Sequence, residues 1–268
     1  MRSRNPILSR SGAFTRGGYA TFDTVASDRD LQVMYDAPSA TAMQTGRMTL
    51  DDVVVKTALV FLTLATTGTL TWIFLAPENL AIPGLAALAG FALALVITFK
   101  RAINPGLVLA YAAVEGVFLG GISHYYNNQF RGIVAQAVLG TLAAFGGMLV
   151  AYKSGAIRVT PRFTKILVGA TLGFVLLALT NLVLGLVGVD GGAGLGLRDA
   201  GPLGLLFGVA GVVLASLFLA LDFHHIEEGI RRGAPERESW LAAFGLAVTL
   251  IWLYLEILRL LAILRGND

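Results

Sequence analysis

The chain has 268 residues, of which 56% are hydrophobic and only 14% are charged. Soluble domains usually carry about 25% charged residues, so this composition excludes a single water-soluble globule and predicts a polytopic protein of the lipid bilayer. The net charge of +3 comes from basic residues in short loops rather than in one basic stripe, which argues against nucleic-acid binding. The chain has no cysteine, which excludes disulfides, zinc thiolates and cysteine nucleophiles.

Residues 1–55 form a polar segment with six Arg and six Asp among many Ser, Thr and Gly. Such a segment buries too little apolar area to offset the entropy that is lost on ordering. We therefore predict a mostly disordered cytoplasmic tail over residues 1–55, with a short helix near residues 28–35. A membrane domain is expected over residues 56–268.

Seven continuously apolar stretches follow, and each is close to or above the ~18–20 residues that cross a hydrocarbon core of ~30 Å. Helices are the expected spanning form, because a helix satisfies its own backbone polar groups, whereas a β-barrel needs short alternating segments. We predict an all-α membrane protein, a bundle of seven transmembrane helices, with spans over residues 57–76, 80–99, 106–123, 132–151, 166–188, 202–221 and 240–264.

Basic residues in the loops predict the orientation, because cytoplasmic loops carry an excess of Lys and Arg. Eleven of them lie directly before the first span or after an even-numbered span: Arg47, Lys56, Lys100, Arg101, Lys153, Arg158, Arg162, Lys165, Arg231, Arg232 and Arg237. The opposite side carries Arg131, Arg198 and Arg265. We therefore expect a multi-pass plasma-membrane protein with a cytoplasmic N-terminus and an external C-terminus.

Two G-x-x-x-G patterns, at residues 116–120 and 169–173, place glycines about one helical turn apart. In membrane helices, such patterns allow neighbouring backbones to approach closely. Because the chain has 32 glycines, we interpret both patterns as ordinary helix contacts within the bundle.

Three acidic residues lie within a span or at its end, and Glu115 is the first of them. It lies about nine residues, or ~14 Å, into its span, which places it near the membrane midplane. No Lys or Arg lies in the same span. Because an ionised carboxylate is costly in a bilayer, Glu115 is either a proton or cation site or a neutral hydrogen-bonded acid that locks two helices.

Glu256 lies in the outer third of the last span, and Arg259 follows it by three residues. The two side chains can pair on one helix face, which lowers the cost of inserting either charge. Glu256 therefore has either a structural role or a role in an ion pathway.

Asp222 closes the sixth apolar stretch. If its helix continues toward Gly229, two antiparallel helices that turn at Pro235 bring Asp222 level with Thr249, because Asp222 precedes the turn by 13 residues and Thr249 follows it by 14. Glu256 then lies seven residues further along the same face of the last helix, about 10 Å deeper in the membrane.

Two His and two Glu follow Asp222 at helical spacing, namely His224, His225, Glu227 and Glu228. His225 lies three residues from Asp222, and each Glu precedes an Arg by four residues. One interpretation is a pH-sensitive gate, since His titrates near neutral pH. The alternatives are a metal site, which lacks a third ligand of zinc type, and a solvated helix end with ordinary ion pairs.

Known catalytic motifs are absent from the sequence: there is no nucleophile elbow, no P-loop and no H-E-x-x-H. We therefore expect no enzymatic activity and no cofactor, apart from Ca²⁺ as a transported ion.

Two motifs near the C-terminus point to a family. LDFHHIEEG at residues 221–229, a short basic hairpin, and WLYLEILRLL at residues 252–261 together resemble the Bax inhibitor-1-like (transmembrane Bax inhibitor motif) family. EGVFLG at residues 115–120 and MTLDDVVVK at residues 48–56 resemble its bacterial branch with a long polar N-terminal tail, typical of actinobacteria. The resemblance covers residues 48–264.

The resemblance implies a seven-helix bundle with the last helix near its centre, and a calcium leak that is controlled by pH. It also implies a closed state in which an acid on the sixth helix and an acid on the seventh share a proton. Asp222 matches the acid of the sixth helix. The position level with it on the seventh helix is Thr249, and Glu256 is the nearest acid on that face.

The leading hypothesis is therefore a pH-sensitive leak of Ca²⁺ or another cation across the plasma membrane. Asp222 would line the cytoplasmic mouth, Glu115 the midplane and Glu256 the outer third, each with transient Ca²⁺ contacts. The alternative is a non-transporting regulator that binds a membrane protease or another membrane protein. A third hypothesis is a zinc-dependent membrane hydrolase that uses His224 and His225.

Overall fold

A computed structural model describes residues 46–100, 104–189, 194–197, 199 and 201–266. Residues 1–45 of the predicted tail, with its short helix, lie outside the described residues, as do Arg101 and Arg198. The described part of the chain folds into the helices α3 (Leu50–Phe74), α4 (Ala81–Phe99), α5 (Pro105–Gln129), α6 (Ile133–Lys153), α7 (Pro161–Leu186), α8 (Pro202–Arg231) and α9 (Glu238–Gly266). All seven are long and apolar enough to cross a membrane, which confirms the predicted bundle.

Local sequence explains where several helices begin. Thr49 caps α3 through a reciprocal capping box, in which its hydroxyl accepts from the backbone of Asp52 and the Asp52 carboxylate accepts from the backbone of Thr49. Thr160 caps α7 through its hydroxyl alone, which accepts from the backbone N–H of Phe163. Proline occupies the first turn of α5, α7 and α8, where its missing N–H costs no hydrogen bond.

Several helices extend beyond the predicted spans because polar residues continue the helix outside the apolar core, as at Pro161, where α7 begins five residues before its predicted span. The first helix begins at Leu50, inside the stretch that was predicted to be tail. α5 continues to Gln129. α8 continues to Arg231 and turns at Gly233, which has a positive φ of 66°. Asp222 therefore lies well inside α8, as the hairpin argument requires.

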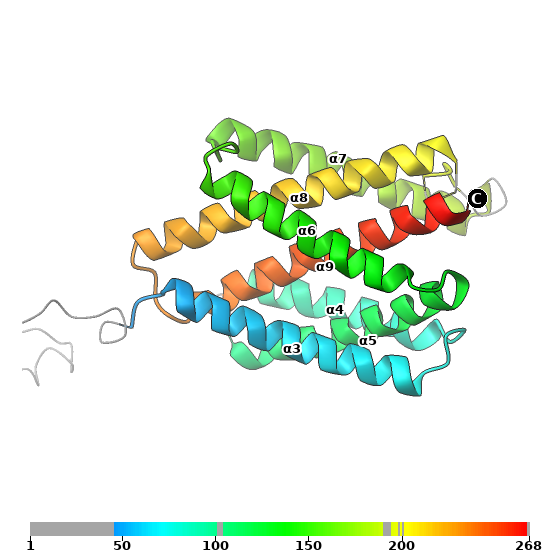
Figure 1. Ribbon diagram of the computed structural model, residues 1–268, viewed down its shortest axis with the longest axis horizontal. Coiled ribbons are helices and arrows are strands. Elements are labelled where there is room, and N and C mark those ends of the chain that lie inside the picture. The colour runs from blue at the N-terminus through cyan, green and yellow to red at the C-terminus, as the bar shows by residue number, and fades with distance from the viewer. Residues whose placement is uncertain (1–45, 101–103, 190–193, 198, 200, 267–268) are drawn as a thin grey trace, which may run out of the picture. The chain divides into compact units, whose positions relative to one another are not determined.

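The last helix is the centre of the bundle, as the family resemblance implies. α9 packs against α3, α5, α6 and α8, and it contributes side chains to all three hydrophobic clusters. Figure 1 shows α9 running between the other helices. α4 and α7 are peripheral, since α4 packs mainly on α5 and α7 on α8. Their large apolar side chains, such as Phe91 and Leu176, are more than half exposed and suited to contact lipid.

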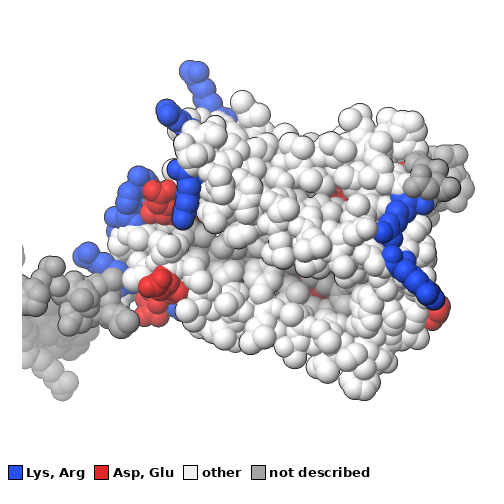
Figure 2. All heavy atoms as spheres, in the orientation of Figure 1, with Lys and Arg blue, Asp and Glu red and all other residues white. Residues whose placement is uncertain are grey.

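Charged side chains gather at the two ends of the bundle. In Figure 2, Lys and Arg cluster most densely at the end where α3 begins and α8 ends, and the surface between the ends is almost entirely uncharged. Successive helices run in opposite directions, which brings the loops predicted to be cytoplasmic to that same end (Figure 1). This arrangement is that of a multi-pass membrane protein.

The two G-x-x-x-G patterns differ in outcome. Gly116 and Gly120 press against α3, where a Cβ on Gly120 would come within 2.8 Å of the Cα of Gly68. This pattern is a helix contact, as predicted. The prediction is wrong for Gly169 and Gly173, because a Cβ at either position would meet no atom within 4 Å. Both glycines lie on peripheral α7, where no neighbouring helix covers them.

Candidate functional site

The α8–α9 hairpin brings Asp222 and Thr249 together. Thr249 is buried at 6% exposure, and its side chain donates a hydrogen bond to the Asp222 carboxyl group. The Oδ2 atom of Asp222 is buried and has no hydrogen-bond partner among the described residues. The predicted level position is therefore confirmed, and half of the acid's bonding capacity is left over for a proton, a water molecule or a cation.

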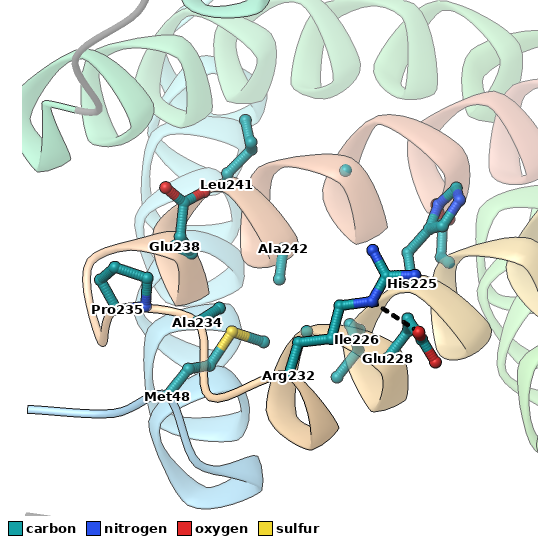
Figure 3. A pocket seen from close by; sticks show the side chains of 13 residues that line it. Met48, His225, Ile226, Glu228, Arg232, Ala234, Pro235, Glu238, Leu241 and Ala242 are labelled. Atoms are coloured by element: carbon teal, nitrogen blue, oxygen red, sulfur yellow. Dashed lines mark hydrogen bonds and ion pairs between the residues drawn. The ribbon is translucent and has the colours of Figure 1, made fainter.

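Asp222 lines a cavity of about 600 Å³ at the end of the hairpin. The walls come from α8, from the loop at residues 234–235, from α9 and from Met48, which precedes α3 (Figure 3). Several lining side chains, among them His225, Arg232 and Leu241, are exposed, so water can reach the cavity. His225 thus shares a water-accessible space with Asp222.

The charged groups of this cavity are mostly acidic. Asp222, Glu228 and Glu238 face it together with one guanidinium group, that of Arg232. Glu228 pairs with Arg232 at 2.6 Å and also with Arg231, so its charge is balanced, and the negative charge of the cavity comes from Asp222 and Glu238. The arrangement favours cations over anions in the cavity.

The ion pairs at the end of α8 differ in part from the predicted spacing. The pair between Glu228 and Arg232 is confirmed. Glu227 and Arg231 have the same spacing, but Arg231 pairs with Glu228 instead. Glu227 accepts a hydrogen bond from the Tyr152 hydroxyl at 2.5 Å. Tyr152 lies in the last turn of α6, and no pattern in the sequence indicates that α6 reaches this carboxylate.

Glu115 lies on α5 with its side chain pressed against α4. It is 8% exposed, and a Cβ on Gly90 would lie only 2.5 Å from its Oε1 atom. No described residue forms a hydrogen bond or ion pair with the carboxyl group. Gly90 was missed at the sequence level, because a glycine in an Ala-rich and Leu-rich helix carries no signal for the acid that it accommodates.

Glu256 and Arg259 form the predicted ion pair on α9. The Arg259 Nη2 atom donates to the Glu256 Oε2 atom at 2.6 Å, and both side chains are about one-eighth exposed. Nη1 donates to the backbone oxygen of Leu197 at 3.3 Å, and the guanidinium stacks over the Phe207 ring. A Cβ on Gly211 would lie 2.7 Å from the Glu256 carboxyl carbon, so this glycine makes room for the pair.

The three acids therefore occupy three separate sites. Asp222 meets Thr249 beside a cavity, Glu115 meets Gly90, and Glu256 meets Arg259. Among the described residues, no three His, Cys, Asp or Glu side chains are close enough together to hold a metal ion. His224 instead lies 3.4 Å from the Tyr152 hydroxyl.

Comparison with protein families adds to this geometry. A family described as Bax inhibitor 1 like matches residues 5–266, which is nearly the whole chain. The chain belongs to the Bax inhibitor 1 like family. The family match includes the α8–α9 hairpin and all seven helices.

A curated relative gives a shorter match. An uncharacterized protein of Chlamydia muridarum (strain MoPn / Nigg) is 33% identical over 81 residues, which is 30% of this Bax inhibitor 1 like chain and 34% of the relative. The match thus spans about a third of that relative's length.

Proposed function

We propose that this chain mediates a pH-sensitive leak of cations, Ca²⁺ among them, across the plasma membrane. The observation that carries the proposal is the Asp222 carboxyl group, which lines a water-accessible acidic cavity and has one buried oxygen without a described partner. A carboxyl group in the wall of such a cavity suits a hard cation. Membership of the Bax inhibitor 1 like family supports the same activity.

The pathway runs from Asp222 at the cytoplasmic mouth, past Glu115 near the midplane, to Glu256 in the outer third. A leak needs only transient contacts, because conduction requires sites that bind weakly enough to release the ion. Three separated carboxyl groups fit this requirement better than one closed cage. The ion is a substrate here, and the proposal includes no resident cofactor.

The pH sensitivity arises at Asp222. Protonation removes a negative charge from the mouth, so the local concentration of cations falls. The Thr249 hydroxyl bonds to Asp222, and the charged or titratable groups that line the same cavity are His225, Glu228, Glu238 and Arg232. A positive charge on His225, which lines the same cavity, acts in the same direction.

A second candidate is a non-transporting regulator that binds a membrane protease or another membrane protein. One observation favours it: the charge of Glu256 is already balanced by Arg259 on the same helix, so this acid is stable without a passing ion. The contact surfaces would be the N-terminal tail and the basic turn with Arg231, Arg232 and Arg237.

The two candidates are separated by measuring Ca²⁺ entry into liposomes that hold the purified protein. The leak predicts flux above that of protein-free liposomes, with a rate that changes between about pH 6 and about pH 8, where buried carboxyl and imidazole groups titrate. Folded protein that gives no flux at any pH contradicts the leak. A partner that is recovered with the full chain, and lost when residues 1–45 are deleted, then supports the regulator.

A further inference from the structure

Residues 46–49, which we call the strap, lie along the turn between α8 and α9. The backbone N–H of Met48 donates to the oxygen of Ala234 at 2.8 Å, and the N–H of Glu236 donates to the oxygen of Gly46 at 2.9 Å. Arg47 and Pro235 face each other between these two bonds as an isolated antiparallel bridge. The strap is thus fixed to the hairpin by its backbone, as an added β-strand would be.

Met48 anchors the strap through its side chain. It is only 4% exposed, and its Sδ and Cε atoms would lie 3.7 Å from a Cβ on Gly229. It belongs to the same hydrophobic cluster as Phe223 and Ile226 on α8 and Leu246 on α9. In Figure 3, the Met48 side chain forms part of the wall of the cavity that Asp222 lines.

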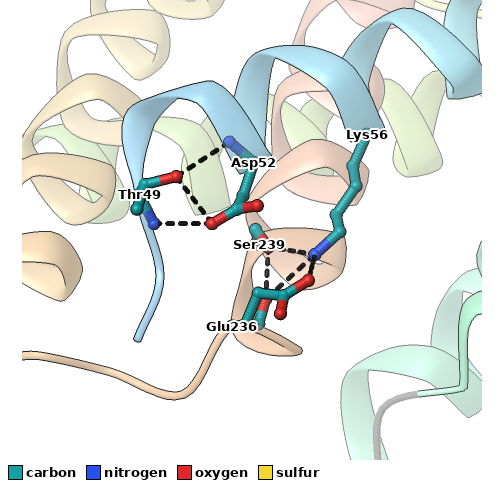
Figure 4. A network of polar contacts seen from close by, with 5 residues as sticks. All are labelled: Thr49, Asp52, Lys56, Glu236 and Ser239. Carbon is teal, nitrogen blue, oxygen red and sulfur yellow. Dashed lines mark hydrogen bonds and ion pairs between the residues drawn. The ribbon is translucent and has the colours of Figure 1, made fainter. Parts of the chain in front are cut away.

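Lys56, on the second turn of α3, makes a second contact with the turn between α8 and α9. Its Nζ atom donates to the Glu236 carboxylate at 2.9 Å and to the Ser239 hydroxyl at 2.8 Å (Figure 4). The Lys56 side chain is only 12% exposed, and Ser239 is fully buried. The capping box of Thr49 and Asp52 lies between the two fastenings and keeps the strap and α3 in a fixed register.

We propose that the strap is a gate at the cytoplasmic mouth, with Met48 and Lys56 as its positioning residues. In the closed state, the strap holds the turn between α8, which carries Asp222, and α9, which carries Thr249. The Met48 side chain then narrows the cavity in front of Asp222. When the strap leaves the turn, the turn can move and the cavity opens to the cytoplasm. The effect on flux rests on the proposed leak, whereas the effect on access to the cavity does not.

Access to the cavity is measured with a single cysteine, which is a clean reporter because the chain has none of its own. Ala242→Cys places a thiol in the cavity wall, and its rate of reaction with a water-soluble maleimide reports opening. Met48→Ala removes the anchor and Lys56→Met removes the second fastening. We expect a several-fold faster reaction in each variant.

Met48→Leu is the matched control, because it keeps the buried volume and restores the slow rate of the parent. Lys56→Met covers the case in which Met48→Ala does not fold, since it keeps the apolar stem of the side chain. Maleimide reaction rates that are unchanged in folded Met48→Ala and Lys56→Met would overturn the gate. So would a rate in Met48→Leu that rises as much as the rate in Met48→Ala.

The effect on flux is tested by locking the strap. In an antiparallel bridge of this type the two Cα atoms lie about 4.5 Å apart, within the range that a disulfide spans. We therefore expect Arg47→Cys with Pro235→Cys to form a disulfide that lowers Ca²⁺ flux into liposomes and whose reduction restores it. Each single variant is the control and should not respond to the reductant.

The two measurements keep the gate and the leak separate. Equal flux in the oxidised and reduced forms of the double variant, with a conducting parent, overturns the gate and leaves the leak in place. A parent that does not conduct contradicts the leak, and the maleimide rates then decide the gate alone.

Discussion

Asp222 accepts a hydrogen bond from one neutral hydroxyl group, that of Thr249, where the family resemblance implies a second acid. A hydroxyl can donate to the carboxylate but cannot share a proton with it over the pH range in which carboxyl groups titrate. In the proposed leak, pH gating therefore depends on Asp222 as a single acid, together with the charges around its cavity.

Thr249→Asp tests this difference directly. It places a second carboxyl group next to Asp222, and two coupled acids release their protons in two steps. We expect the plot of Ca²⁺ flux against pH to acquire a second step that the parent lacks. Thr249→Val, which removes the hydroxyl without adding an acid, is the control and should keep a single step. A Thr249→Asp curve that superimposes on the parent curve argues against a titrating role for this pair.

Gly90 is the residue on which the placement of Glu115 depends. Gly90→Ala places a methyl group against the Glu115 carboxyl group, which is the flexible end of a buried side chain, and we expect a loss of about 1 kcal/mol in the free energy of unfolding. The same substitution at Gly84, where a Cβ meets no atom within 4 Å, is the matched control. Unfolding in detergent micelles measures both.

A double variant identifies the cause of that loss. If the clash with Glu115 is responsible, Gly90→Ala costs little in a Glu115→Ala background, because the two substitutions are then coupled. Equal costs in both backgrounds would show that Gly90 is needed for some other reason.

At the scale of the helix, α9 carries an ion pair whose charges would cost more free energy in a helix that had no neighbours. Arg259 is oriented by three groups at once, namely Glu256, the backbone oxygen of Leu197 and the Phe207 ring. The pair therefore ties α9 to α8 and to the loop that precedes α8. Buried pairs of this kind are more costly to break on one side than to remove altogether.

Glu256→Leu and the double variant Glu256→Leu with Arg259→Leu distinguish these cases. The single substitution leaves the guanidinium charge without its carboxylate, and we expect it to lower the free energy of unfolding by about 3–5 kcal/mol. The double variant should lose less, because neither charge remains. A double variant that is less stable than the single one would show that the pair itself is a net source of stability.

The sequence predicts the helices better than the contacts between them. Continuous apolar runs identify all seven spans, and the spacing about Pro235 identifies the pairing of Asp222 with Thr249. Both follow from local geometry along one or two helices. The contacts of Gly90 with Glu115, of Gly211 with Glu256 and of Tyr152 with Glu227 join helices whose packing a single sequence does not specify. For the same reason the pattern at residues 169–173 misleads, since a small residue allows a close contact without requiring one.

At the scale of the whole molecule, the membrane orientation decides which solution the cavity and the strap face. The density of basic residues at the end where α3 begins predicts that this end is cytoplasmic. Single cysteines test the prediction in intact cells with a membrane-impermeant thiol reagent. We expect reaction at Asn79→Cys, in the loop between α3 and α4, and protection at Arg237→Cys, in the turn between α8 and α9. The reverse pattern would place the cavity outside the cell.

The central claim is that the Asp222 carboxyl group makes a cation leak depend on pH. The most direct measurement is Ca²⁺ flux into liposomes from about pH 6 to about pH 8, where a buried carboxyl group can titrate, for the parent, for Asp222→Asn and for the exposed loop control Glu78→Gln. The account predicts a leak that responds to pH in the parent and in Glu78→Gln, and a leak without that response in Asp222→Asn. A pH response that survives unchanged in folded Asp222→Asn would contradict it.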